Sequence, residues 1–113
     1  MKINHVTLLV SNKKQSEKFY IESLGFSKKE VGEHLWIDIG EQYIHLTQNS
    51  GKPVTDTFYH FAIEVDDLFA YVEKLKEKGV SILNFSENKM QIFIKDPDGN
   101  MIEFIDSKDK FFK

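Results

Sequence analysis

The chain contains no cysteine and no arginine: its 15 positively charged side chains are all lysine. The absence of cysteine excludes disulfide bonds, thiolate metal sites and a cysteine nucleophile. The absence of arginine means that an anionic group must be held by lysine, by backbone amides or by a metal ion, because only a guanidinium offers a bidentate fork. These absences narrow both the metal ligands and the anion contacts that the chain can offer.

Long hydrophobic runs are also missing, since no segment approaches the ~18 apolar residues of a membrane span. Residues 1–5 lack the pattern of a signal peptide, so we expect a cytoplasmic protein with no membrane partner. The formal net charge of −3 argues against a nucleic-acid partner, which requires a basic surface. A length of 113 residues with 41% hydrophobic and 29% charged residues is typical of one globular domain.

The hydrophobic pattern predicts the same order of elements, one strand, one helix and three strands, twice along the chain. In the first half the helix begins after Asn12 and ends at Gly25. In the second half it begins after Asp66 or Asp67 and ends at Gly79. The strands are expected over residues 3–10, 26–31, 34–39 and 42–47, and then over residues 58–65, 80–84, 90–95 and 101–105.

The two halves also align weakly in sequence, which indicates an internal repeat. His5 falls against His60, Gly25 against Gly79, and the run 44–46 against the run 102–104. We therefore predict an α+β fold of two βαβββ modules that share a core in one domain, residues 1–113. Module 1 covers residues 1–50, module 2 covers residues 58–106, and a polar linker lies at about residues 48–57. In the tail, residues 107–113, two phenylalanines are expected to pack on the body or on a partner chain.

Four polar side chains are predicted on strand faces that lie opposite apolar faces, because side chains alternate along a strand. The repeat relates His5 to His60 and His45 to Glu103, and equivalent positions near a pseudo-twofold axis can converge. Three neutral imidazoles and one carboxylate suit a divalent transition metal with open positions for water or substrate. We therefore predict His5, His45, His60 and Glu103 as metal ligands.

Tyr43 is the candidate catalytic residue, because its hydroxyl could donate a hydrogen bond to a bound oxygen, although its residue type and position favour an apolar wall. Trp36, the single tryptophan, is either a pocket wall or part of the core. His34 is interpreted as a surface residue, and Glu64, about 13 Å along the strand from His60, as a trough wall or surface residue. The two aspartates of the run 96–99 occupy turn positions that favour aspartate for backbone reasons.

Four segments of this sequence resemble the vicinal oxygen chelate superfamily, which includes glyoxalase I, fosfomycin-resistance enzymes, extradiol dioxygenases and bleomycin-resistance proteins. The segments are residues 3–6, 19–26, 59–65 and 96–104, of which the last, Asp-Pro-Asp-Gly-Asn-Met-Ile-Glu-Phe, is the most specific. The resemblance covers nearly the whole chain. It implies an eight-stranded open mixed sheet, a cup around a divalent metal with the helices on the outer face, and often a homodimer that completes the cup.

The resemblance also implies roles for individual residues. His5, His60 and Glu103 match the common metal ligands of the family. His45 stands in the run Ile-His-Leu-Thr, where glyoxalase I resembles Ile-Glu-Leu-Thr. Histidine there keeps a possible ligand but removes the carboxylate that a glyoxalase would use as a base, so His45 is left as a ligand or a base. Without it, the set is two histidines and one carboxylate, the arrangement of non-haem iron dioxygenases.

The leading hypothesis is a metal-dependent, glyoxalase-like enzyme acting on a small molecule. A nickel, zinc, manganese or iron ion would chelate two substrate oxygens as a Lewis acid and stabilise an enediolate or alkoxide, in isomerase, lyase or thiol-transfer chemistry. Dioxygenase chemistry is less expected, because the chain is shorter than most extradiol dioxygenases. The alternative is a metal-free protein that sequesters a small molecule or drug, as bleomycin-resistance proteins do, and a third possibility is a scaffold with a vestigial site.

Overall fold

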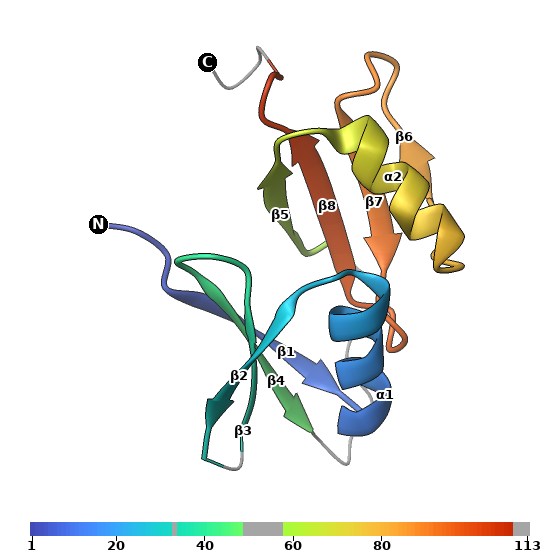
Figure 1. Cartoon of the computed structure of the whole chain (residues 1–113). Helices are drawn as coiled ribbons and strands as arrows, with labels where there is room; N and C mark the ends of the chain where they lie inside the picture. Colours follow the sequence, from blue (N-terminus) through green and yellow to red (C-terminus); the bar gives the residue numbers. More distant parts are fainter. Residues whose placement is uncertain (33, 49–57, 110–113) are drawn as a thin grey trace. The chain divides into compact units, whose positions relative to one another are not determined.

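The computed structural model describes residues 1–32, 34–48 and 58–109 (Figure 1). The chain folds as two compact units, Met1–Val54 and Thr55–Lys113. Most of the predicted linker and the tail residues 110–113 lie outside the described residues. The linker boundaries and the packing of the tail phenylalanines therefore stay predictions.

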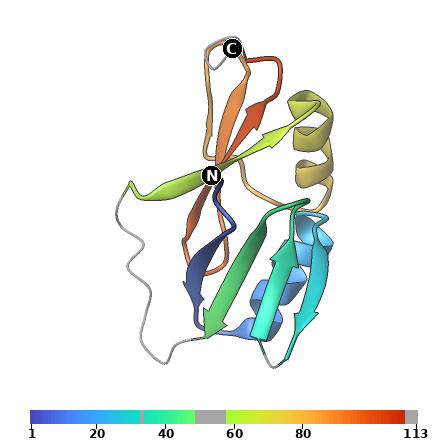
Figure 2. The same ribbon diagram turned by 90° about the vertical axis from the view of Figure 1, so that its left-hand side faces the viewer.

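The first unit contains a four-stranded mixed sheet in the order β1-β4-β3-β2 (Figure 2). The first strand, β1 (His5–Val10), pairs in parallel with β4 (Tyr43–Gln48). The other two strands, β3 (His34–Asp38) and β2 (Ser27–Val31), continue the sheet with antiparallel pairing. Between β1 and its parallel neighbour β4 the chain runs through the helix, β2 and β3, since two parallel strands cannot be joined by a tight hairpin.

The helix of the first unit begins as α1 (Lys13–Glu17) and continues as a π-helix, η1 (Lys18–Ser23). The Asn12 side chain caps α1 by accepting a hydrogen bond from the Gln15 N–H at 3.1 Å, as the sequence predicts. The π-helical half, with each N–H bonded five residues back, was not predicted from the sequence. Gly25 follows η1 with a φ angle of 82°, a left-handed conformation that suits glycine where a helix ends.

The second unit repeats this topology, with a four-stranded mixed sheet in the order β5-β8-β7-β6. The parallel pair is β5 (His60–Val65) with β8 (Met101–Asp106), and β7 (Gln91–Lys95) and β6 (Asn84–Phe85) follow with antiparallel pairing. The predicted α+β fold of two βαβββ modules, with eight strands within the described residues, is therefore confirmed.

The predicted strand at residues 80–84 was wrong in position, since β6 begins only at Asn84. The Val80 N–H donates to the Leu75 carbonyl at 2.9 Å and so completes the end of the preceding helix. Pairing with β7 starts at Leu83, whose N–H donates to the Phe93 carbonyl at 2.9 Å. Val80, the first apolar residue after the helix, therefore caps the C-terminus of the helix and does not pair in the sheet.

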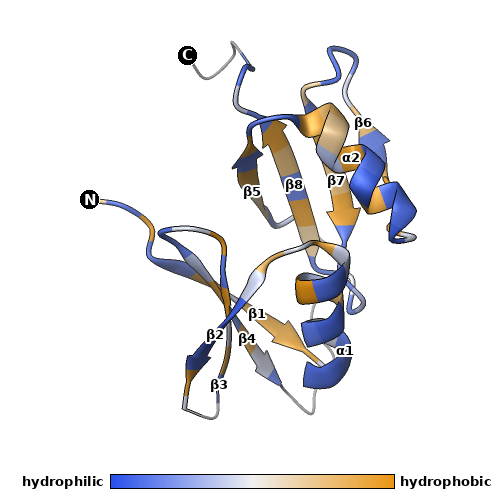
Figure 3. Cartoon of the chain, viewed as in Figure 1, coloured by the Kyte–Doolittle hydropathy of each residue, from blue (hydrophilic) through white to orange (hydrophobic). Residues whose placement is uncertain are grey.

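The helix of the second unit, α2 (Leu68–Glu77), packs against β8. Asp67 is its N-cap and accepts a hydrogen bond from the Ala70 N–H at 3.1 Å, as cap residues commonly do. Leu68, Val72 and Leu75 are buried with helical spacing, so one face of the helix supplies the contacts. Hydrophobic residues dominate β7 and β8, whereas the loop between β6 and β7 is hydrophilic (Figure 3).

One face of each sheet forms the core of its unit. In the first unit the buried hydrophobic strand residues are Val10, Leu35, Ile37, Ile44 and Leu46, and in the second they are Ile92, Ile94, Ile102 and Phe104. These residues occupy the faces that the sequence predicts as apolar. The residues of the candidate site belong to the opposite faces, because neighbours along a strand point to opposite sides of the sheet.

Asp106, a buried residue at the end of β8, ties the start of α2 to the sheet. Its carboxylate accepts hydrogen bonds from the Leu68 N–H at 3.0 Å and from the Lys108 N–H at 2.8 Å. These two backbone donors lower the pKa of Asp106, because they favour its charged form. The Leu68 N–H is one of the helix-terminal donors that has no partner within its own helix.

We expect Asp106→Asn to lower the free energy of unfolding at pH 7 by about 1–2 kcal/mol, because an uncharged amide accepts these bonds less strongly. A carboxyl whose pKa is lower in the folded than in the unfolded state stabilises the protein above its unfolded pKa of about 3.9, and loses that contribution as the pH falls through the folded value. The difference in the free energy of unfolding between wild type and variant, measured by urea unfolding, should therefore become smaller below about pH 4. A constant difference across this range, or an equal loss in the exposed control Asp66→Asn, would contradict the assignment.

Candidate functional site

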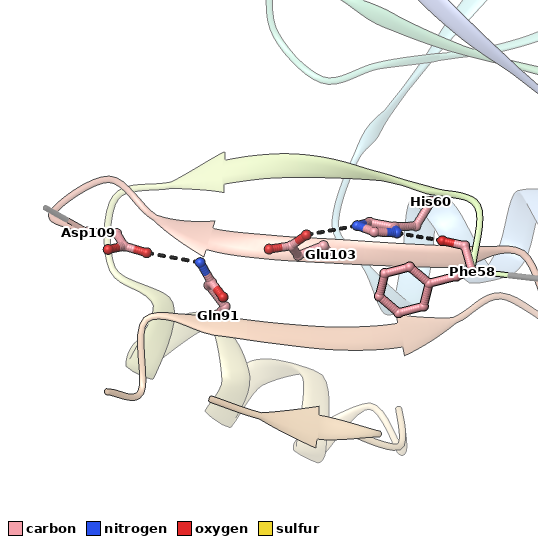
Figure 4. Close-up of polar contacts among 5 residues, drawn as sticks. All are labelled: Phe58, His60, Gln91, Glu103 and Asp109. Atoms are coloured by element: carbon pink, nitrogen blue, oxygen red, sulfur yellow. Dashed lines mark hydrogen bonds and ion pairs between the residues drawn. The ribbon is translucent and has the colours of Figure 1, made fainter. Parts of the chain in front are cut away.

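The second unit brings two of the predicted metal ligands into direct contact. The His60 Nε2 lies 3.0 Å from the Glu103 Oε1, and the two side chains are 21% and 12% exposed (Figure 4). His60 begins β5, and Glu103 lies within β8 opposite Ala62, two residues further along β5. Because alternate residues share a face, the parallel pairing places both side chains on one side of the sheet.

The other ring nitrogen of His60 already has a partner, because Nδ1 lies 2.8 Å from the Phe58 carbonyl oxygen. A carbonyl only accepts hydrogen bonds, so Nδ1 carries a proton and donates it. A carboxylate also only accepts, and a neutral ring protonated at Nδ1 would present a lone pair to Glu103. A proton or a metal ion between the two atoms would satisfy the short contact between Nε2 and Oε1.

Two aromatic side chains contact His60. The Phe93 ring lies 5.1 Å from the His60 ring in an edge-on arrangement, and the exposed Phe58 ring lies 5.0 Å from it. Gln91, also on β7, donates to the Asp109 carboxylate at 3.1 Å (Figure 4). His60 is thus flanked by apolar rings on the side of the sheet that carries Glu103.

The first unit places His5, Trp36 and His45 in the equivalent arrangement. His45 pairs in register with Thr7 on β1 and with Trp36 on β3. In the second unit Glu103 pairs in the same way with Ala62 on β5 and with Phe93 on β7. The register therefore relates His45 to Glu103, as the sequence repeat predicts, and it also relates Trp36 to Phe93.

The side chains of this group are in close contact. The His45 ring stacks flat on Trp36, with centroids 4.2 Å apart and an interplanar angle of 2°. The His5 ring meets the edge of Trp36 at 4.8 Å and lies 6.2 Å from the His45 ring. The His45 Nε2 is 3.5 Å from the Thr47 Oγ1, a long contact. Trp36 therefore contacts both predicted ligands of this unit, as the pocket-wall interpretation requires.

A third imidazole belongs to this group. The exposed His34 ring lies 5.4 Å from the His45 ring in an edge-on arrangement. The position of His34 beside a turn predicted an ordinary surface residue, and this contact was missed. The signal that could have found it is the spacing to Trp36, because two residues apart on a strand means the same face.

The pKa of His45 is lowered, chiefly by partial burial and further by the positive charges of His34, His5 and Lys13. Burial and nearby like charges both disfavour the protonated ring. The ring is therefore held neutral over a wider pH range than a free histidine. A neutral imidazole carries a lone pair, which a ligand and a general base both require.

Tyr43 lies on the same sheet face, opposite His5 in the β1–β4 pairing. Its ring is 6.4 Å from the ring of Trp36. The Lys29 Nζ lies 5.0 Å from the centroid of the Tyr43 ring, within the range of a cation–π contact. Tyr43 is therefore adjacent to the candidate ligands of this unit. The Nε1 of Trp36 is buried and has no hydrogen-bond partner within the described part of the chain.

The four predicted metal ligands are thus brought together as two pairs, one in each unit. Within residues 1–32, 34–48 and 58–109, no group of three or more His, Asp or Glu side chains is arranged so that it could hold a metal ion. Asp96, in contrast, has the backbone role that the sequence predicts, because its Oδ1 accepts from the N–H groups of Asp98 and Asn100.

Comparison with known proteins identifies the family. The model of the Glyoxalase/Bleomycin resistance protein/Dioxygenase superfamily matches residues 2–104, and the chain belongs to this superfamily. The match confirms the resemblance to the vicinal oxygen chelate group.

Curated relatives cover almost the whole chain. A protein of Haemophilus influenzae named "Lactoylglutathione lyase" is 33% identical over 127 residues, covering 96% of this chain and 94% of that protein. A Vibrio parahaemolyticus protein named "Probable lactoylglutathione lyase" is 32% identical over 126 residues, covering 95% of this chain and 91% of that protein. Both names agree with the prediction of a glyoxalase-like enzyme.

Solved structures share the fold. A glyoxalase family protein from Bacillus anthracis superposes with a TM-score of 0.83 at 23% identity, covering 96% of each chain. The fosfomycin resistance protein FosX from Mesorhizobium loti superposes with a TM-score of 0.79 at 16% identity, covering 98% of this chain and 95% of that chain.

Among the described residues, no helix is both long enough and apolar enough to span a membrane.

Proposed function

We propose that this protein is a metal-dependent, glyoxalase-like lyase or isomerase that acts on a small molecule. His5, His45, His60 and Glu103 are its proposed metal ligands. The observation that carries the proposal is the His60–Glu103 contact, in which Nδ1 is occupied by a carbonyl and Nε2 faces a carboxylate at 3.0 Å. The His60 Nε2 and the Glu103 Oε1 form a pair of lone-pair donors that a cation could bind.

The donor set fits such a metal. Imidazole nitrogens with a carboxylate oxygen suit nickel, zinc, manganese or iron. The Phe58 carbonyl gives His60 the outer hydrogen bond that metal-bound histidines commonly have. When bound, the ion supplies Lewis-acid stabilisation to negative charge on substrate oxygens. The Glu103 carboxylate contributes negative charge to the site, which favours a divalent cation over a neutral occupant.

Two residues of the first unit can handle protons. His45, whose pKa is lowered, is available in its neutral form either as a further ligand or as the base that accepts a substrate proton at a ring nitrogen. The flat contact with Trp36 restrains the His45 ring in one plane. The Tyr43 hydroxyl could donate a hydrogen bond to a substrate oxygen from the same face.

The names of the curated relatives make lactoylglutathione the first substrate to test. Beside His60, the Phe58 and Phe93 rings offer apolar walls for a substrate, and walls of this kind orient a substrate while polar groups give specificity. The family resemblance further leads us to propose a homodimer located in the cytoplasm.

Metal analysis of protein purified without a histidine tag tests this function. We expect about one equivalent of nickel, zinc, manganese or iron per chain. The His60→Ala variant should lose the metal and, with it, turnover of lactoylglutathione, while its circular dichroism spectrum stays that of the wild type. If wild-type protein takes up no metal after addition of Mn²⁺, Ni²⁺ or Zn²⁺, the enzyme proposal fails and the metal-free binding protein becomes the better explanation.

A further inference from the structure

Asn4, the residue before the proposed metal ligand His5, is placed to hold the His5 ring. The Asn4 Oδ1 lies 2.9 Å from the His5 Nδ1. We propose that Asn4 is a positioning residue that keeps the proton of the His5 ring on Nδ1 and so reserves Nε2, with its lone pair, for the metal. This inference rests on the proposed function, because it assigns the coordinating atom of one proposed ligand.

The backbone around Asn4 is anchored from the neighbouring strand. The Tyr43 N–H donates to the Asn4 carbonyl at 3.0 Å, and the Gln42 Nε2 donates to the Ile3 carbonyl at 2.9 Å. Two consecutive residues before His5 are therefore tied to the chain that leads into β4. A side chain on an anchored backbone loses less freedom when it holds a neighbouring ring than a side chain on a free terminus would.

In the second unit the equivalent histidine also has an oxygen acceptor at Nδ1, but a backbone carbonyl supplies it. His60 is the repeat equivalent of His5, and its Nδ1 is 2.8 Å from the Phe58 carbonyl oxygen. The residue that aligns with Asn4 is Tyr59, which is 87% exposed. An oxygen acceptor on Nδ1 thus recurs at both equivalent histidines, from a side chain in one unit and from the backbone in the other. Independent solutions at two related positions favour a functional requirement over a chance surface contact.

The chemical consequence concerns the tautomer of the ring. A neutral imidazole has one N–H donor and one acceptor nitrogen, and the hydrogen bond made by one nitrogen sets the state of the other. With the Asn4 Oδ1 as the acceptor, Nδ1 holds the proton and Nε2 is free to coordinate. The opposite orientation of the Asn4 amide would place a donor against Nδ1 and move the ring proton to Nε2, which would block coordination there.

Nitrogen-15 NMR of the metal-free protein, at a pH where the rings are neutral, reports the tautomer of each histidine directly. The four histidines can be assigned from His→Gln variants. In wild type we expect the Nδ1–H form at His5. In Asn4→Ala the His5 ring should shift toward the Nε2–H form, which an unrestrained imidazole prefers, whereas His60 should not change and so serves as the internal control.

Metal titration completes the test. Loss of an outer hydrogen bond to a metal-bound histidine typically lowers metal affinity about 10–100-fold, so Ni²⁺ should bind Asn4→Ala about tenfold more weakly or worse. Asn4→Asp, whose carboxylate can only accept, should restore both the Nδ1–H tautomer and the affinity.

The outcomes separate this inference from the proposed function. An Nε2–H tautomer at His5 in wild type, or wild-type Ni²⁺ affinity in Asn4→Ala, would overturn the role of Asn4 while leaving the metal enzyme intact. Failure of wild type itself to bind Ni²⁺, Mn²⁺ or Zn²⁺ would overturn the proposed function, and with it the purpose assigned to Asn4, whatever the tautomer.

Discussion

Replacing Glu103 by glutamine should lower the affinity of the protein for Mn²⁺ or Ni²⁺ by at least about a hundredfold, or about 3 kcal/mol. The variant keeps the volume of the side chain but removes the negative charge that lies 3.0 Å from the His60 Nε2. An amide can donate a hydrogen bond to the lone pair of Nε2, so the contact and the fold should survive without a cation. The loss of affinity should exceed that for removing an outer hydrogen bond, because the carboxylate oxygen is itself a proposed ligand.

The matched control for this prediction is Glu64→Gln. Glu64 is an exposed carboxylate on the same strand as His60 and on the same side of the sheet, and it pairs in register with Ile105. The control therefore removes the same charge from the same unit without touching the His60–Glu103 pair. Isothermal titration of both variants with Mn²⁺ should show a near-wild-type affinity for the control. Equal weakening in both variants would mean that Glu103 acts only through the general charge of the surface, and would argue against its role as a ligand.

Replacing Asp96 by alanine should lower the free energy of unfolding by about 3 kcal/mol. The Asp96 carboxylate belongs to a residue that is 5% exposed, and it closes the turn between β7 and β8. Its Oδ1 accepts from the Asn100 N–H at 2.8 Å and from the Asp98 N–H at 3.0 Å, and its Oδ2 accepts from the Asn100 Nδ2 at 2.9 Å. Alanine would leave these donors without their charged acceptor in a partly buried turn, and the penalty for such donors exceeds the net gain from an ordinary hydrogen bond.

Urea unfolding followed by circular dichroism measures this loss. Asp66→Ala, at an exposed position outside the turn, should change the stability by less than about 0.5 kcal/mol. Asp96→Asn should lose an intermediate amount of stability, because its single side-chain carbonyl oxygen can accept only some of the hydrogen bonds that the carboxylate accepts. A loss below about 1 kcal/mol in Asp96→Ala would show that the turn is held by its backbone hydrogen bonds alone.

The local elements of this fold could largely be predicted because their hydrophobic patterns are regular. Alternation in β3 and β4 and helical spacing in α2 each report a single buried face. The errors arose where an apolar residue had two possible partners. Val80 completes a helix end and does not join β6. The second half of the first helix adopts π-helical hydrogen bonds that leave no distinct spacing in the sequence.

In the candidate site, too, some features could be predicted from the sequence and others could not. The repeat and the strand parity were enough to place His5, His45, His60 and Glu103 on the faces opposite the core, but not to predict that His60 contacts Glu103. They could not reveal the Phe58 carbonyl, since a backbone oxygen has no residue type that marks it. Nor could they reveal that His34 reaches His45, because its position beside a turn suggested only a surface residue.

The sequence by itself determined the two βαβββ modules, the family and the residue types available for a metal, because periodicity, repeats and motifs are properties of the chain order. The tertiary structure alone decided which nitrogen of His60 is occupied, which ring stacks on which, and that the other nitrogen of His60 meets a carboxylate. Those features depend on strand register and side-chain orientation at distances of about 3 Å, where a hydrogen bond either forms or does not.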